Sequence, residues 1–386
     1  MKTVASVVLN NFINDSRVLK EAISLANNNY KVVVIALHDD KLPIIEKINN
    51  ILVRRIVLFS RSFWSRNKFI QIFKYIQFLY KSVSIIKNKD IVHCNDLKAL
   101  PVGVLAKLLF NKKLKVVYDA HEYETQMFGM SKAEKFFSII FEKILINHVD
   151  ALLTVSNSIA KEYKRLYPFV KPKLVYNTPY FTNFNRDEDQ KNNIFRNKFN
   201  IGENQKIFIY QGGLSKGRGI ETILVTFQHI HSNNYNNDNM PVIIFMGYGV
   251  LSKLIKDYSK FCSNIFYHKA VKVDEVLSHT RSADFGINFI ENSCLSYYYC
   301  MPNKLFEYLM ADLPVITSNL KDVRIFVEEN NIGEVSQTND VYGLFLAIKK
   351  ILNKDKSHYI DNISSVKEKY NWEKQEVKLL ETYKNL

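Results

Sequence analysis

The chain has 386 residues, 47% of them hydrophobic, which is enough for two domains that each have a core. No apolar run reaches the roughly 18 residues of a membrane span, and the four cysteines form no CxxC pair, which disfavours a disulfide framework or a zinc site. The net charge of +15 is uneven, because residues 1–185 hold 28 Lys and Arg against 14 Asp and Glu, and residues 186–386 hold 25 against 24. A positive excess in one half predicts an anionic partner for that half, either nucleic acid or anionic lipid.

The first elements alternate between strand and helix. Thr3–Leu9 reads as a buried strand, a helix with apolar residues from Val18 onward follows, and Lys31–Leu37 reads as a second strand. This β-α-β order predicts a parallel sheet with a right-handed crossover. The loop after the first strand, LNNFINDSR, has no GxGxxG pattern, which disfavours a simple dinucleotide-binding domain.

A strongly basic segment follows, with fourteen Lys or Arg and two acids in residues 54–115. Within it, Asn67–Lys87 predicts one long helix that is apolar on one side, with lysines between. Such a helix either docks on a core or lies in a membrane interface, and core docking of most of the apolar face is the default expectation. The basic groups Arg54-Arg55 and Arg61–Arg66 favour anionic lipid at its outer side.

Polar residues follow two predicted strands of the first half. The strand Ile91–Cys94 is followed by Asn95 and Asp96, and the strand Leu114–Tyr118 by the sequence DAHE, which includes His121 and Glu122. Polar groups at the ends of parallel strands are typical of open α/β active sites. A single histidine is usually structural, but this position favours a functional role.

The second half begins after a segment rich in Asn, Asp and Lys, residues 178–205, which predicts a linker. The strand Ile207–Tyr210 then leads through QGGLSKGRG into the helix Ile220–Ile230. Glycines let the backbone approach an anion closely, and a helix N-terminus attracts it. No GK[ST] follows, so this is not a Walker loop. The turn predicts a phosphate site to which Lys216 and Arg218 add charge.

The segment 301–318, MPNKLFEYLMADLPVITS, predicts a loop, a helix and a buried strand. The helix start at Asn303 presents free backbone N–H groups, and Lys304 adds a full charge, so a phosphate could bind there. Glu307, one turn into the helix, could accept hydrogen bonds from two neighbouring hydroxyls such as those of a ribose. The alternative is an ordinary surface glutamate on an amphipathic helix.

The run PNKLFEYL…DLPVI resembles the nucleotide-sugar site of the family 4 retaining glycosyltransferases. The stretches DSRVLKEAISLA, VVYDAHEYE, LTVSNSIAKEY and YQGGLSKGRGIETIL match the same family in the same order. The resemblance implies the GT-B fold, an α/β fold of two facing Rossmann-like domains with parallel sheets and a deep interdomain cleft. It implies an acceptor-side domain over residues 1–180, a nucleotide-sugar-binding domain over residues 181–370, and a helix over residues 371–386 that packs back on the first domain.

The resemblance also implies roles for individual residues. Glu307 would hold the donor ribose, and His121 and Glu122 would act at the reacting sugar. The remaining donor-binding candidates, which would face the diphosphate, are Gly212, Gly213, Lys216, Arg218, Asn303 and Lys304. The acceptor-side candidates are Asn11, Asp15, Arg17 and Asp96. A plain helix cap is an equal alternative for Asp15.

The chain departs from the family pattern at two positions. Gly213 stands where the family usually has an arginine at the diphosphate, and Lys216 could compensate for it. Tyr299 stands where the family usually has the first of two glutamates, which normally contacts the sugar. The identity of the donor sugar therefore cannot be inferred from the family, although Glu291 is a candidate to replace the missing glutamate.

The resemblance, together with the uneven charge, implies a bacterial enzyme that transfers a sugar, with retention, from a nucleotide sugar to a lipid-linked or cell-surface glycan precursor, such as that of a capsule or O-antigen. No cofactor or metal is expected, because no DxD motif stands at a strand end and Asp187-Glu188-Asp189 lies in the linker. The protein is expected in the cytoplasm, on the inner face of an anionic membrane. No nucleic-acid motif accompanies the charge. A sugar-nucleotide epimerase and a basic nucleic-acid-binding protein are the alternatives.

Overall fold

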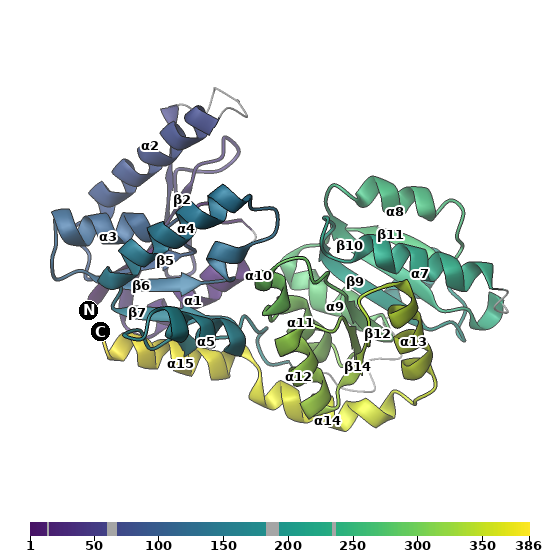
Figure 1. Cartoon of the computed structure of the whole chain (residues 1–386). Helices are drawn as coiled ribbons and strands as arrows, with labels where there is room; N and C mark the ends of the chain where they lie inside the picture. The colour runs from purple at the N-terminus through teal and green to yellow at the C-terminus, as the bar shows by residue number, and fades with distance from the viewer. Residues whose placement is uncertain (14, 60–67, 183–192, 234–236) are drawn as a thin grey trace. The chain divides into compact units, whose positions relative to one another are not determined.

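The computed structural model describes residues 1–13, 15–59, 68–182, 193–233 and 237–386 (Figure 1). They form two compact units, one of Met1–Val175 with Glu376–Leu386 and one of Tyr176–Gln375. Each unit contains its own β-sheet. The basic group Arg61–Arg66 and the acidic group Asp187–Asp189 lie outside the described residues.

The first unit contains an eight-stranded sheet in the order β3-β4-β2-β1-β5-β6-β7-β8. Neighbouring strands pair in parallel except for β3 and β4, which form an antiparallel pair. The predicted parallel sheet is confirmed, and its central strands are buried runs of valine and isoleucine, as a sheet covered by helices requires. The strands are β1 (Lys2–Val7), β2 (Tyr30–Leu37), β3 (Ile45–Ile48), β4 (Ile51–Ile56), β5 (Ile91–Asn95), β6 (Lys115–Ala120), β7 (Ala151–Thr154) and β8 (Lys173–Leu174).

The helices of the first unit cover both faces of this sheet. The connections through α2, α3 and α4 all run toward the β8 edge of the sheet, whereas the connection through α1 runs toward the β3 edge. Right-handed crossovers therefore place α2, α3 and α4 on one face of the sheet and α1 on the opposite face. The helix α3 packs against both α2 and α4 (Figure 1). The helices are α1 (Ser16–Asn27), α2 (Lys68–Ile86), α3 (Leu100–Leu109), α4 (Lys132–Leu145), α5 (Asn157–Leu166) and, from Glu376 onward, α15 (Trp372–Lys384).

The structure corrects two expectations about the basic segment. Most of the apolar side of α2 does not dock on a core, since Phe69, Ile72, Phe73, Ile76 and Tyr80 are more than half exposed, whereas Val83 and Ile86 near the end of the helix are buried. Arg55 does not belong to an outer basic group either. It is buried, and its Nη1 donates to Oε2 of Glu46 at 2.7 Å.

The second unit contains a six-stranded, all-parallel sheet in the order β11-β10-β9-β12-β13-β14. Its strands are β9 (Ile207–Gly213), β10 (Val242–Tyr248), β11 (Ile265–Lys269), β12 (Phe285–Asn288), β13 (Val315–Thr317) and β14 (Gly333–Val335). Its helices are α6 (Ile194–Phe199), α7 (Ile220–Ser232), α8 (Ser252–Tyr258), α9 (Val276–Arg281), α10 (Leu295–Tyr298), α11 (Asn303–Met310), α12 (Lys321–Asn330), α13 (Val341–Leu352) and α14 (Ser357–Lys369). No helix among the described residues is both long enough and apolar enough to cross a membrane.

Candidate functional site

In the first unit, polar side chains gather at the carboxyl ends of β5 and β6. The Nε2 atom of His121 lies 2.9 Å from Oδ2 of Asp119, and its Nδ1 lies 3.3 Å from Oδ1 of Asp96. Burial by itself lowers the pKa of His121, but the carboxylates of Asp96 and Asp119 outweigh burial and raise the pKa to about 10. His121 is therefore a cation near neutral pH, and it faces a carboxylate at each ring nitrogen.

Arg17 holds Asp119 in place from the adjacent helix α1. Its Nε and Nη2 donate to the two carboxylate oxygens of Asp119 at 2.8 and 2.7 Å, and its Nη1 donates to the Val175 carbonyl at 2.9 Å. Burial opposes ionisation of Asp119, but Arg17, followed by His121, keeps its pKa well below the ordinary range. The side chain of Arg17 is thus buried and paired, and in this arrangement it orients Asp119.

A second layer lies beneath this pair. Nε2 of His93 lies 3.4 Å from both Asp119 and Glu21, and its Nδ1 lies 2.7 Å from the hydroxyl of Tyr383 on α15. Glu21, His93 and Asp119 are close enough to hold a metal ion. The guanidinium of Arg17 already pairs with both carboxylates, so we assign these residues to a salt-bridge network.

The other first-unit candidates lie in the loops around this network. Asp15 caps α1, because its Oδ1 accepts from the Val18 N–H at 3.3 Å. The carbonyl of Asn11 accepts from Nε of Arg55 at 3.1 Å. Glu122 is half-buried directly after His121.

The backbone at Asp96 is unusual and explains where its carboxylate points. Its φ of 67° lies in the left-handed region, which is uncommon for a residue with a side chain. Its N–H donates to the Asp119 carbonyl at 2.9 Å, and the next N–H, of Leu97, donates to Oε2 of Glu124 at 3.3 Å. These bonds hold the turn, so the half-exposed Asp96 carboxylate stays beside His121.

In the second unit, the glycine-rich turn connects the end of β9 to the start of α7. Gly219, with a φ of 70°, precedes α7, and a Cβ there would lie 2.3 Å from the Phe289 carbonyl oxygen. Only glycine fits this backbone without a shift. The guanidinium of Arg218 lies 5.1 Å from the ring centre of Tyr297, and Lys216 is exposed on the turn.

Lys304 is the least satisfied polar group of this site. It stands at the second residue of α11, is 9% exposed, and its Nζ lies 3.6 Å from the ring centre of Tyr210. Among the described residues, no group accepts a hydrogen bond from this Nζ. Burial, followed by the charge of Arg218, lowers the pKa of Lys304 well below its ordinary value. A buried amine without a partner is costly unless a ligand pairs with it.

Glu307 lies one turn further along α11, and its carboxylate is held by a neighbour. Nε2 of Gln211 donates to Oε2 of Glu307 at 2.5 Å, and Oε1 of Gln211 accepts from the hydroxyl of Thr280 at 2.5 Å. Sequence patterns gave no reason to single out Gln211, because its role depends on a contact across 96 positions of the chain. Asn303, the first residue of α11, is exposed.

Two glycines at the end of β9 differ in what they could tolerate. Gly212 has a φ of 110°, which side chains rarely adopt, whereas Gly213 has no positive φ. A Cβ built at either position would meet no described atom within 4 Å. The place where the family usually has an arginine is therefore open and free of backbone strain.

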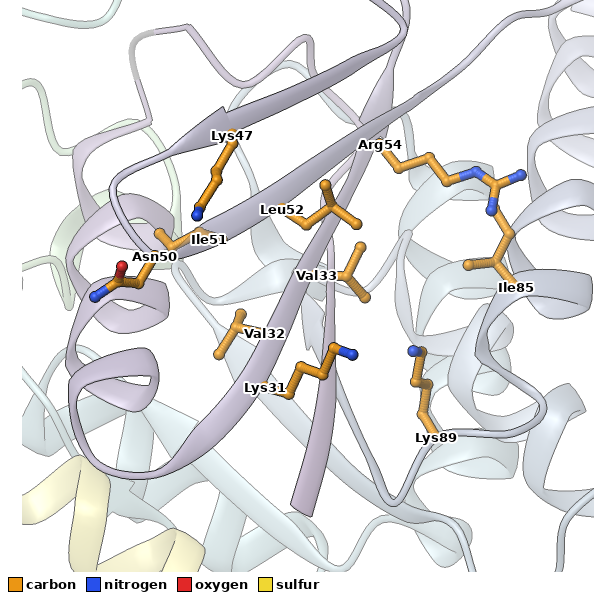
Figure 2. A pocket seen from close by; sticks show the side chains of 10 residues that line it. All are labelled: Lys31, Val32, Val33, Lys47, Asn50, Ile51, Leu52, Arg54, Ile85 and Lys89. Carbon is orange, nitrogen blue, oxygen red and sulfur yellow. The ribbon is translucent and has the colours of Figure 1, made fainter. Parts of the chain in front are cut away.

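A basic pocket of about 350 Å³ lies away from these groups, at the opposite edge of the first unit's sheet. Figure 2 shows the side chains that line it, from the starts of β2 and β4 and the end of α2. Its charged lining residues are Lys31, Lys47, Arg54 and Lys89, and none of the described residues that line it is a carboxylate. Because these residues begin rather than end the parallel strands, the pocket is distinct from the cluster around His121.

Two family models match the chain in separate regions. The model described as Glycosyltransferase Family 4 matches residues 16–178, and the model described as Glucosyltransferase 3-like, C-terminal domain, matches residues 227–372. A comparison with curated protein sequences gives no match.

Several solved structures are similar to the chain over nearly its whole length. Sucrose-phosphate synthase of Thermosynechococcus elongatus is 15% identical with a TM-score of 0.78, and the match covers 100% of this chain and 99% of that one. HepE of Anabaena in complex with UDP-glucose is 12% identical with a TM-score of 0.74, and the match covers 100% of both chains. WaaG, a glycosyltransferase involved in lipopolysaccharide biosynthesis, is 14% identical with a TM-score of 0.66, covering 97% of this chain and 98% of that one. At these identities the likeness concerns the fold.

Proposed function

We propose that the chain transfers a sugar, with retention of configuration, from a nucleoside diphosphate sugar to a lipid-linked or cell-surface glycan precursor. The proposal starts from the family, because the chain belongs to the glycosyltransferases, with a family 4 N-terminal part and the GT-B fold. The family and the fold predicted from the sequence are confirmed. The donor, the acceptor and the residue roles are the proposal.

The observation that carries the donor proposal is the buried amine of Lys304, which has no hydrogen-bond acceptor in the part of the chain that the structure describes. It stands at a helix N-terminus, where free backbone N–H groups add positive potential, and the guanidinium of Arg218 contributes to the same field. A diphosphate would supply the missing acceptor and offset the burial of the amine. Glu307, held by Gln211, would accept hydrogen bonds from the ribose hydroxyls. The UDP-glucose complex of HepE supports this class of donor.

The chemistry follows from where charge develops. Breaking the glycosidic bond of the donor leaves negative charge on the diphosphate, so cations already fixed at that position stabilise the transition state more than the ground state. Arg218 would supply this stabilisation, together with Lys304, which the bound diphosphate keeps protonated. His121, cationic near neutral pH and fixed between Asp96 and Asp119, would contribute positive charge beside the reacting sugar rather than act as a base.

The acceptor proposal rests on charge. The excess of 28 cations over 14 acids in residues 1–185 suits an anionic membrane, where a lipid-linked or surface-glycan precursor would be met at the inner face. Sugar-nucleotide epimerase activity is disfavoured, because an epimerase needs no such surface. Nucleic acid stays the alternative anionic partner.

The donor proposal is tested by calorimetric titration of the full chain with UDP, ADP and GDP. We expect Lys304→Met to weaken binding of the preferred nucleotide by about 1.5–3 kcal/mol, the net value of a hydrogen bond to a charged group. Lys260→Met is the matched control, because Lys260 is exposed and pairs with Asp257. Equal affinity of Lys304→Met and the wild type for every nucleotide would contradict the donor site.

The ribose assignment is tested with 2′- and 3′-deoxy forms of the nucleotide that binds. Glu307→Gln should weaken binding of the normal nucleotide, and this loss should shrink for the form that lacks the hydroxyl it holds. Gln211→Leu should show the same pattern, because Gln211 orients the carboxylate. A loss that is identical for all forms would mean that both residues act only on the fold.

The reaction itself is tested by incubating the enzyme with a panel of nucleotide sugars, with and without membrane lipid extracts. Transfer of label to a lipid fraction supports the proposal, whereas release of a changed nucleotide sugar without acceptor would favour the epimerase. Arg218→Ala should lower kcat as well as affinity, and His121→Ala should lose activity at an unchanged Tm. If activity and Tm fall together in His121→Ala, the histidine is structural.

A further inference from the structure

The helix α2 presents a continuous apolar face to solvent. Its members recur at spacings of three and four residues, which places them on one side of the helix. They are Phe69, Ile72, Phe73, Ile76 and Tyr80, with exposed fractions of 81%, 56%, 55%, 54% and 76%. Phe78 on the opposite side is buried, and so are Val83 and Ile86 near the end of the helix, and these residues pack α2 against the unit. The exposed apolar residues therefore do not contribute to the packing that holds α2 in place.

The helix α4 buries the acidic side chain of Glu142 together with Leu145, and exposes most of its apolar residues. Oε1 of Glu142 accepts from the hydroxyls of Tyr118 and Tyr163, both at 2.8 Å, and Oε2 accepts from Tyr167 at 3.1 Å. These three bonds to a fully buried carboxylate fix the rotation of the helix about its axis. The residues exposed on the other sides of α4 are Phe136, Phe137, Ile139, Ile140, Phe141 and Ile144, each at 40% or more.

The two apolar faces belong to one layer. The helix α3 packs against both α2 and α4, and all three helices cover the same face of the sheet (Figure 1). The end of α3 continues the pattern, because Leu109 and Phe110 are 67% and 60% exposed. Isolated exposed apolar residues are normal, but a group of this extent over neighbouring helices marks an interaction surface. We call these exposed apolar residues of α2, α4 and the end of α3 the α2–α4 surface.

The charge around the α2–α4 surface indicates which kind of partner is complementary to it. The sequence of α2 holds three lysines and no acid, and of the two glutamates of α4, Glu134 forms a capping box with Ser131 and Glu142 is buried. The basic pocket at the end of α2 adds four cations and no carboxylate. A second copy of this chain would bring like charge against like charge, whereas an anionic lipid leaflet is complementary in both charge and polarity.

We propose that the α2–α4 surface inserts into the boundary between headgroups and acyl chains of an anionic leaflet. Charge attracts the unit to the leaflet, and the exposed apolar side chains, once they have inserted among the lipids, hold it there even when salt screens the charge. The proposal takes from the proposed function only that a membrane is the place of the acceptor, and it does not depend on the donor chemistry. It differs from electrostatic association alone, which a high salt concentration abolishes.

The test is flotation of the full chain with vesicles of phosphatidylglycerol and phosphatidylcholine, at low salt and at about 1 M salt, where the Debye length is about 3 Å. We compare the wild type with Phe73→Ser/Ile76→Ser on α2 and Phe137→Ser/Ile140→Ser on α4. Phe261→Ser is the control, because Phe261 is 79% exposed and lies in the second unit. None of these substitutions changes charge, and all are at exposed sites, so an unchanged Tm checks that each variant folds.

We expect the wild type and the control to keep a vesicle-bound fraction at high salt, and each double variant to lose affinity by about tenfold or more, given the apolar area removed from insertion. Complete release of the wild type at high salt, or double variants that bind like the control, would overturn the proposal. A wild-type dimer in the absence of vesicles that the double variants dissociate would assign the surface to self-association instead. UDP titration of the same proteins separates the two proposals. If the wild type does not bind UDP or another nucleotide, the donor site is contradicted, but the proposal of membrane insertion is not affected.

Discussion

At the end of β9 two adjacent glycines, Gly212 and Gly213, belong to the proposed diphosphate site, and they allow a direct test of it. Gly213→Arg places a cation where the family usually has one, on a backbone without positive φ and with open space around the Cβ. We expect UDP to bind about 1.5–3 kcal/mol more tightly, as for a new hydrogen bond to a charged group. Calorimetry measures the gain.

Gly212→Arg is the control for this substitution. Its position has equal space, but its φ of 110° strains any side chain, so the variant should lose stability without gaining affinity. If both variants bind UDP like the wild type, the turn does not face the diphosphate.

The lowered pKa of Lys304 predicts that nucleotide binding depends on pH. Its pKa in the free protein lies well below the ordinary 10.5, chiefly because burial disfavours the charged amine. A bound diphosphate favours the protonated form and so raises this pKa. Binding then takes up a proton where the pH lies between the pKa of Lys304 in the free protein and its higher pKa in the complex, and affinity falls as the pH rises through that window.

Calorimetry in buffers with different ionisation enthalpies measures the proton uptake. Wild type should show uptake, and Lys304→Met should show less or none. Equal uptake in both proteins would assign the proton to another group.

At the scale of elements, the contact between α11 and β12 sets the position of the donor candidates. A Cβ at Gly286 of β12 would lie 2.4 Å from the Tyr308 ring of α11, closer than side chains approach. The Tyr308 hydroxyl in turn accepts from the Gln211 N–H and donates to the Ile287 carbonyl, both at 3.1 Å. Glycine at position 286 therefore lets α11 lie against the sheet.

Gly286→Ala should cost about 1–3 kcal/mol of unfolding free energy, as overpacking does. It should also weaken UDP binding, because α11 carries Lys304 and Glu307. Gly202→Ala, where a Cβ would meet only ordinary contacts at 3.5 Å or more, should change neither. Chemical denaturation and UDP titration give the two quantities, and unchanged UDP affinity in a destabilised Gly286→Ala would separate α11 from the donor.

At the scale of the whole molecule, the last residues of the chain stabilise the unit formed by the first ones. Tyr383 of α15 is fully buried, its ring packs edge-on against Tyr30 at 5.6 Å, and its hydroxyl lies 2.7 Å from Nδ1 of His93. Tyr383→Ala should cost the first unit about 3–5 kcal/mol, as other large-to-small core substitutions do.

Hydrogen exchange can localise this loss. Amides of β1 and β5 in the first unit should lose protection in Tyr383→Ala, whereas those of β9 and β10 should keep it. Val377→Ala is the control on the same helix, because Val377 is 53% exposed. A uniform loss over both sheets would mean that the two units unfold together.

The sequence alone determined the elements whose signal is local. β-Branched runs such as Lys31–Leu37, the helix after Asn303 and the glycine-rich turn all form where the patterns predicted them, because propensity, periodicity and turn chemistry act over a few residues. The short hairpin of β3 and β4 was missed, because β4 exposes Leu52 and buries Arg55, which reverses the usual pattern of apolar residues inside and charged residues outside.

Only the tertiary structure decided which side chains meet and which face of a helix stays exposed. Arg17 and Asp119 are 102 positions apart, and Gln211 and Glu307 are 96 apart, so no local pattern could pair them. The apolar side of α2 is a further case, because periodicity reports that a face is apolar and not whether anything covers it. Coverage depends on how much core the rest of the unit supplies, and here Phe78, Val83 and Ile86 are buried while Phe69 to Tyr80 on the apolar side stay exposed.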